Sequence, residues 1–183
     1  MTRYAAFLRG VNVGGVNLKM ADVAEALQDA GFTDVTTILA SGNALLDSRS
    51  GVAAVRKKAE QALRDEFGYD AWVLCYEMDA IAEISAAYPF EREVEGHHSY
   101  VTFVSDETVL RELTELTDRA GAGEKIEAGS GVLYWQVPRA GTLDSTIGKT
   151  MGKKRYKSST TTRNLRTLDK VLRRQRGAEM NYR

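Results

Sequence analysis

The chain alternates short apolar runs with stretches in which apolar residues recur every three or four positions. The runs are typical of strands, and the recurring positions are typical of helices that pack on one side. In the first half, strands are expected at 3–9, 35–41, 44–47 and 71–76, and helices at 18–30 and 52–67. Their order, β-α-β-β-α-β, is that of the ferredoxin-like or split β-α-β fold.

The second half begins the same order again, at an offset of roughly 95 residues. Strands are expected at 99–104, 125–130 and 132–137, and a helix at 106–119. Residues 142–159 fit either a frayed helix or a loop, whereas leucines at 165, 168 and 172 predict a helix over 160–175. We therefore predict an α+β fold of two ferredoxin-like subdomains related by duplication, with a C-terminal helix.

The two halves are separated by a short predicted helix that stops at Pro89 and by a polar connection after it. The expected division of the chain is a first subdomain at 1–78, the helix and connection at 79–98, a second subdomain with the C-terminal helix at 99–176, and a tail at 177–183. A chain of 183 residues is long enough for two small subdomains.

Charge is unevenly distributed, although the formal net charge is zero. Residues 1–148 hold 13 Lys/Arg and 23 Asp/Glu, whereas residues 149–183 hold 12 Lys/Arg and 2 Asp/Glu. Such a basic segment either binds a polyanion or docks on the acidic part of the same chain. No apolar run is long enough to span a membrane. Cys75 is the single cysteine, which rules out an internal disulfide and favours a cytoplasmic location.

The stretch AAFLRGVNVGGVN, at 5–17, contains an arginine, two asparagines and three glycines, which is more than a strand-to-helix connection needs. In the predicted topology this loop and the SGN turn at 41–43 meet at the same end of the sheet. Guanidinium, amide and glycine N–H groups there are suited to an anion. The expected ligand-binding residues are Arg9, Asn12, Gly14, Gly15, Lys19, Ser41 and Asn43. The structural alternative is a plain turn, with Asn17 capping the next helix and Arg9 in a surface ion pair.

Three segments, FLRGVNVGG (7–15), ILASGN (38–43) and TTTRNLRTLDKVL (160–172), together resemble the DUF1697 family of uncharacterised bacterial proteins. The similarity also includes residues 18–37 and extends to about residue 176. It implies a compact α+β fold of two related subdomains, and it implies no activity. The T-x-R-N motif of the family falls on Thr161, Arg163 and Asn164; here Leu165 follows, where the family usually has an aromatic residue.

The sequence leaves three functions open. The leading one is a soluble protein that binds an anionic, possibly phosphorylated, small molecule at the RGVNVGG/SGN edge, with Arg163 and Asn164 near the ligand. A nucleic-acid-binding module would use the basic 149–176 segment and aromatic residues of LYWQ, 133–136, on an open sheet. A self-associating structural protein is the third.

Several kinds of chemistry are not indicated. His97 and His98 are the two histidines of the chain, and adjacent residues of an extended segment point to opposite sides, so we predict no metal site. No cofactor is expected, and no residue pattern assigns a reaction. Cys75 lies in a predicted strand and is expected to be a small core residue.

Overall fold

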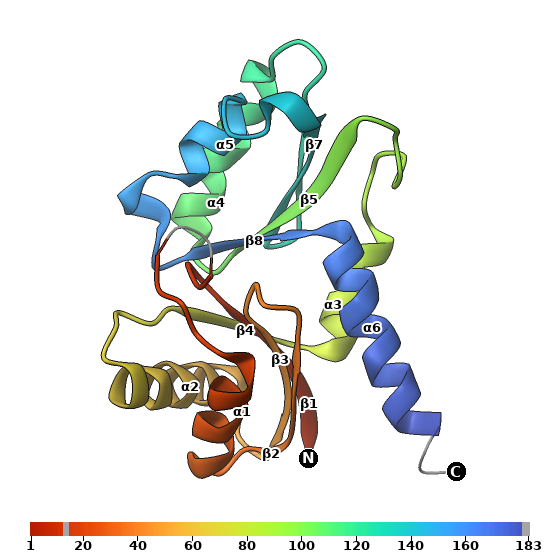
Figure 1. Ribbon diagram of the computed structural model, residues 1–183. Coiled ribbons are helices and arrows are strands. Elements are labelled where there is room, and N and C mark those ends of the chain that lie inside the picture. Colours follow the sequence, from red (N-terminus) through yellow and green to blue (C-terminus); the bar gives the residue numbers. More distant parts are fainter. Residues whose placement is uncertain (13–14, 181–183) are drawn as a thin grey trace. The chain divides into compact units, whose positions relative to one another are not determined.

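The computed structural model of the protein describes residues 1–12 and 15–180. The chain divides into two compact units (Figure 1). The first contains Met1–Ala82 and Lys170–Arg183, and the second contains Glu83–Asp169.

The first unit is a four-stranded sheet with two long helices. Its elements are β1 (Thr2–Leu8), α1 (Met20–Asp29), β2 (Thr33–Ile38), β3 (Asn43–Ser48), α2 (Val52–Phe67) and β4 (Val73–Glu77). The strand order is β2-β3-β1-β4, and every neighbouring pair is antiparallel. Because β1 and β2 both run antiparallel to β3, they run parallel to each other. The expected β-α-β-β-α-β order is confirmed.

The core of the first unit lies between this sheet and helices α1 and α2, which cover the same face (Figure 1). Val23 and Leu27 of α1 and Val55, Ala59 and Leu63 of α2 are buried in it, at the helical spacing read from the sequence. A buried carboxylate adds a polar connection between α2 and β4. Glu60 Oε1 accepts hydrogen bonds from Arg56 Nε and from Val73 N, both at 3.0 Å, and the second bond fixes the start of β4.

The second unit repeats this plan. Its elements are β5 (His97–Val104), α4 (Glu107–Thr114), β6 (Lys125–Gly129), β7 (Val132–Pro138), α5 (Thr146–Met151) and β8 (Thr160–Asn164), with 3-10 turns at Glu115–Arg119, Arg139–Gly141 and Lys154–Tyr156. The strand order is β6-β7-β5-β8, which matches that of the first sheet position by position. Helices α4 and α5 lie on one face (Figure 1). The predicted pair of ferredoxin-like subdomains related by duplication is confirmed.

Helices α3 (Met78–Ala86) and α6 (Leu165–Met180) complete the fold. The prediction of one helix over 160–175 is wrong at its start, because Thr160–Asn164 is a strand that pairs with β5. The β-branched threonines favour extended backbone, and the helical spacing of leucines begins only at Leu165. Asn164 marks the junction, since its Oδ1 accepts a hydrogen bond from the backbone N of Arg166 at 2.9 Å.

One hydrogen bond occurs at equivalent places in the two sheets. Leu8 N, at the end of β1, donates to Gly42 O at 2.8 Å, and Val104 N, at the end of β5, donates to Gly131 O at 2.9 Å. Both glycines lie in the turn between the second and third strands. The connections that follow differ in length, because residues 9–19 separate β1 from α1, whereas only residues 105–106 separate β5 from α4.

Gly42 occupies a position that requires glycine. Its φ is +84°, and a Cβ there would lie 2.5 Å from Val11 Cγ2 and 2.9 Å from Leu8 Cβ. Val11 and Leu8 are both buried, so neither side chain has room to withdraw.

We expect Gly42→Ala to lower the free energy of unfolding by about 2–4 kcal/mol, through overpacking and left-handed backbone strain. Urea denaturation followed by circular dichroism measures this change. Gly51→Ala is the matched control, because Gly51 has φ −69° and no atom within 4 Å of the added methyl. The control is expected to change stability by less than about 1 kcal/mol. Equal effects of the two substitutions would contradict the role assigned to Gly42.

Candidate functional site

The loop after β1 and the turn after β2 meet at one end of the first sheet. Phe7 of β1 pairs with Asn43 of β3. Arg9 lies two residues after Phe7 and Ser41 two residues before Asn43, so both lie at this end of the sheet. The bond from Leu8 N to Gly42 O closes the same end. The expectation that Arg9 and Asn43 lie at one end of the sheet is therefore confirmed by the strand register.

Asn12 connects this loop to its surroundings through its carboxamide. Its Nδ2 donates to Leu18 O at 2.9 Å and to Ala40 O at 2.7 Å, and its Oδ1 accepts from Leu18 N at 2.9 Å. The residue has φ +56°, a left-handed conformation that asparagine tolerates better than most residues. The Asn12 carboxamide thus binds both Leu18, which precedes Lys19, and Ala40, which precedes Ser41.

Asn43 is buried, with 1% of its surface exposed. Its Nδ2 donates to Ile38 O at 2.8 Å and to Ser41 Oγ at 3.1 Å, so it shapes the turn from inside. A hydroxyl has one proton to donate and two lone pairs to accept. Since Ser41 Oγ accepts from Asn43, its own proton remains available for a further acceptor.

The cationic residues at this end differ in their surroundings. Arg9 is half-buried, and burial lowers the pKa of its guanidinium, which nevertheless stays charged at neutral pH. Lys19 is exposed and forms the N-cap position of α1 without a side-chain capping bond. Asn17 therefore does not cap α1 as the sequence alternative expected. Gly10 has φ +69°, and Gly15 lies beside its carbonyl. Gly14 lies outside the described residues.

The T-x-R-N residues lie in β8 of the second unit. Arg163 is buried, and its Nη1 donates to Thr161 Oγ1 and to Thr162 O, both at 2.8 Å. Asn164 is half-buried at the start of α6. Both side chains have a role in the local backbone structure, the first within β8 and the second at the strand-to-helix junction.

The aromatic residues of the nucleic-acid alternative are buried. Tyr134 donates its hydroxyl to Ile84 O at 2.8 Å, and Trp135 donates Nε1 to Thr102 Oγ1 at 2.9 Å. Tyr100 of β5 lies against Trp135, with ring centroids 4.3 Å apart. Tyr134 and Trp135 therefore belong to the core and form no open stacking surface.

Among the side chains described, those of residues 1–12 and 15–175, no group of three His, Cys, Asp or Glu is placed to hold a metal ion. Burial raises the pKa of the Cys75 thiol to about 12, so the thiolate form needed for nucleophilic chemistry is not populated at neutral pH. None of the helices in these ranges is long and apolar enough to cross a membrane.

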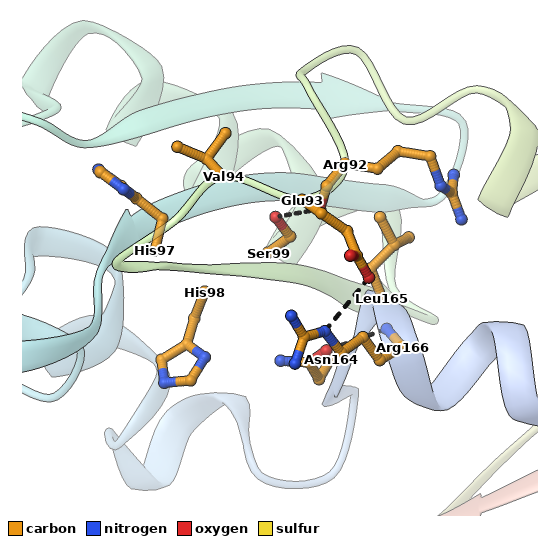
Figure 2. A pocket seen from close by; sticks show the side chains of 9 residues that line it. All are labelled: Arg92, Glu93, Val94, His97, His98, Ser99, Asn164, Leu165 and Arg166. Carbon is orange, nitrogen blue, oxygen red and sulfur yellow. Dashed lines mark hydrogen bonds and ion pairs between the residues drawn. The ribbon is translucent and has the colours of Figure 1, made fainter.

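A second cluster of polar groups was missed by the sequence analysis. Figure 2 shows it in the second unit, where β5, the connection before it and the start of α6 form a small pocket. Arg166 Nε lies 3.4 Å from Glu93 Oε1 within it, and His98 lines the same pocket. Burial, followed by the charges of Arg139 and Arg166, lowers the pKa of His98. The histidines had been considered only as metal ligands, and this pocket depends on residues far apart in sequence.

Comparison with known proteins identifies a family without an assigned activity. The family model described as "Protein of unknown function (DUF1697)" matches residues 1–134. No curated protein matches the sequence. Among solved structures, the conserved bacterial protein SP0830 from Streptococcus pneumoniae is similar, with a TM-score of 0.76 at 20% sequence identity, over 94% of this chain and 97% of that one. This likeness supports the fold.

The three bonds of the Asn12 side chain predict a stability loss on their removal. We expect Asn12→Gly to lower the free energy of unfolding by about 1.5–4.5 kcal/mol, because each of the three bonds contributes roughly 0.5–1.5 kcal/mol and glycine keeps the left-handed backbone. Asn17→Gly, at an exposed position of the same loop, is the control and is expected to change stability by about 0.5 kcal/mol or less. A loss no larger than that of the control, measured in urea, would show that the carboxamide does not hold the loop.

The basic segment gives a second prediction, about nucleic acid. Of its cations, Arg155 pairs with Glu112, Arg166 pairs with Glu93, and Arg163 is buried. We therefore expect weak, sequence-independent RNA binding at low salt and almost none at about 0.15 M, where charges are screened over roughly 8 Å. Fluorescence anisotropy with labelled single-stranded RNA measures this. Sequence-selective, sub-micromolar binding at that salt, lost on replacing Lys153, Lys154 and Arg155 by alanine, would reverse the conclusion.

Proposed function

Because the chain belongs to the DUF1697 family, whose function is unknown, we propose from the geometry of its own residues that it binds an anionic small molecule. The binding site is the Arg9 end of the first sheet, and the ligand carries a phosphoryl group. The observation that carries this proposal is the pair of hydrogen bonds from the Asn12 carboxamide to Leu18 O, just before Lys19, and to Ala40 O, just before Ser41. Asn12 itself lies three residues after Arg9, so it brings these segments close to the arginine.

We divide the residues at this end into a positioning group and a ligand-binding group by the chemistry of their side chains. Asn12 and Asn43 use their carboxamides on the backbone and on Ser41, so we assign them to positioning. Arg9, Lys19 and the Ser41 hydroxyl supply the ligand contacts. Glycine N–H groups of the loop add donors that no side chain obstructs.

Electrostatics favours a phosphoryl group over a single negative charge. A guanidinium makes two parallel hydrogen bonds to phosphate oxygens, and such charged bonds are about twice as strong as neutral ones. Arg9 is half-buried, which reduces screening by water and strengthens attraction to an anion. Lys19 adds a second, flexible positive charge. Arg163 has its own hydrogen bonds within β8, and the proposal does not depend on it.

We extend the proposal to the cell compartment and to the class of activity. We place the protein in the cytoplasm, where phosphorylated metabolites are abundant and a single buried thiol such as Cys75 stays reduced. The site is proposed for binding, and no reaction is assigned to it.

We expect phosphorylated metabolites to raise the melting temperature of the wild-type protein and Arg9→Ala to weaken their binding at least about tenfold. A lost charged hydrogen bond costs about 1.5–3 kcal/mol, which corresponds to that change in affinity. Thermal-shift screening followed by isothermal titration calorimetry measures both effects. Arg49→Ala is the matched control, because Arg49 is exposed and follows the opposite end of β3.

Arg9→Lys separates charge from geometry, since lysine keeps the positive charge and loses the two-pronged donor. It is expected to bind with an affinity between those of the wild type and Arg9→Ala. Equal affinities of the Arg9→Ala and Arg49→Ala proteins, or no response of the wild type to any phosphorylated compound, would remove this proposal.

A further inference from the structure

We propose that the small pocket between β5, its preceding connection and the start of α6 is a second oxyanion site, in which Glu93 covers Arg166 until a phosphate or sulfate group displaces it. All of the residues involved belong to the second unit. The inference is independent of the Arg9 site.

The strand register brings the polar groups of this pocket together. Tyr100 of β5 pairs with Asn164 of β8, and His98 lies two residues before Tyr100 on the same face of the strand. Arg166 follows Asn164 in the first turn of α6. Figure 2 shows its guanidinium directed into the pocket, where the Glu93 carboxylate meets it.

Asn164 contributes a donor to the same place. Its Oδ1 accepts from Arg166 N at 2.9 Å, which leaves the Nδ2 group of the carboxamide for another partner. No hydrogen bond joins this Nδ2 to the side chains described for residues 1–12 and 15–175 or to the backbone of 1–12 and 15–180. An oxyanion in the pocket would accept from it.

The charges around His98 come from three elements. Arg139 follows β7, Arg166 belongs to α6, and Glu93 lies in the connection before β5. After burial, the charges of Arg139 and Arg166 lower the pKa of His98, so both arginines lie close enough to act on the imidazole. A concave surface with positive potential attracts anions.

Glu93 is a weak occupant of this site. The side chains of Arg166 and Glu93 are 62% and 69% exposed, and an exposed ion pair contributes about 0–1 kcal/mol. The remaining cavity of about 20 Å³ has room for one or two water molecules and not for an oxyanion. An incoming anion therefore has to replace the Glu93 carboxylate, and the low stability of the exposed pair permits this exchange.

His98 provides a direct reporter for the test. Its pKa is measured by nuclear magnetic resonance of the imidazole C–H signals, with and without sodium sulfate, and a His97→Gln protein identifies its signal. Sulfate keeps two negative charges throughout a histidine titration, unlike phosphate. Sodium chloride at equal ionic strength is required as a control, because screening of Arg139 and Arg166 also raises the lowered pKa of His98.

We expect sulfate to raise the pKa of His98 further than chloride does, because a bound anion stabilises the imidazolium. Arg166→Gln should weaken sulfate binding about tenfold or more, as expected for loss of a charged hydrogen bond. Glu93→Gln should strengthen it up to about fivefold, since the competing pair contributes about 0–1 kcal/mol. Arg111→Gln, at an exposed position on α4, is the control and should bind as the wild type does.

Two results would overturn the proposal. The first is an equal effect of sulfate and chloride on the pKa of His98, which means that only screening acts. The second is a sulfate effect that Arg166→Gln leaves unchanged while its urea unfolding midpoint matches that of the wild type, which means that the anion binds elsewhere. Because Arg9 is unchanged in all of these proteins, failure here is distinguishable from failure at the first site.

Discussion

The Asn12 carboxamide makes three hydrogen bonds, two with Leu18 and one with Ala40, which lies 28 residues further along the chain. Backbone groups in a long connection are costly to leave without partners, and this side chain supplies partners to Leu18 and Ala40 at once. The start of α1 and the turn before β3 are thereby positioned relative to β1. The arrangement also determines which residues are left for a ligand, because an amide already bonded to the backbone has no donor to spare.

The sequence predicted the first unit well because its elements have clear periodicity. Val23 and Leu27 recur at helical spacing, and β1 is a continuous apolar strand at the centre of its sheet. The error at 160–164 has a specific cause. Thr160, Thr161 and Thr162 show neither helical nor alternating hydrophobicity, and their pairing with β5 completes the strand that their β-branched side chains favour.

The candidate sites were harder to predict than the elements. Residue type indicated that Asn12 and Asn43 were candidate ligand-binding residues. Whether an amide contacts a ligand or the backbone, however, depends on distances of a few tenths of an ångström. The pocket of the second unit had no sequence signal as a whole. Glu93 lies in a connection that reads as solvated, His98 in a pair considered for metal binding, and Arg166 in a basic helix. Only the pairing of β5 with β8 brings them together.

The two copies of the fold differ most in the connection after their first strand. Residues 9–19 fill it in the first unit, whereas residues 105–106 suffice in the second, although the same glycine hydrogen bond closes both strand ends. The entropy of closing a chain segment grows with its length, so the longer connection costs on the order of 1–2 kcal/mol more. The second copy demonstrates that the topology does not require those extra residues. The longer connection of the first unit is therefore disfavoured by chain entropy. The hydrogen bonds of Asn12 offset this cost with a favourable enthalpy, whereas the shorter connection of the second unit does not have this cost to offset.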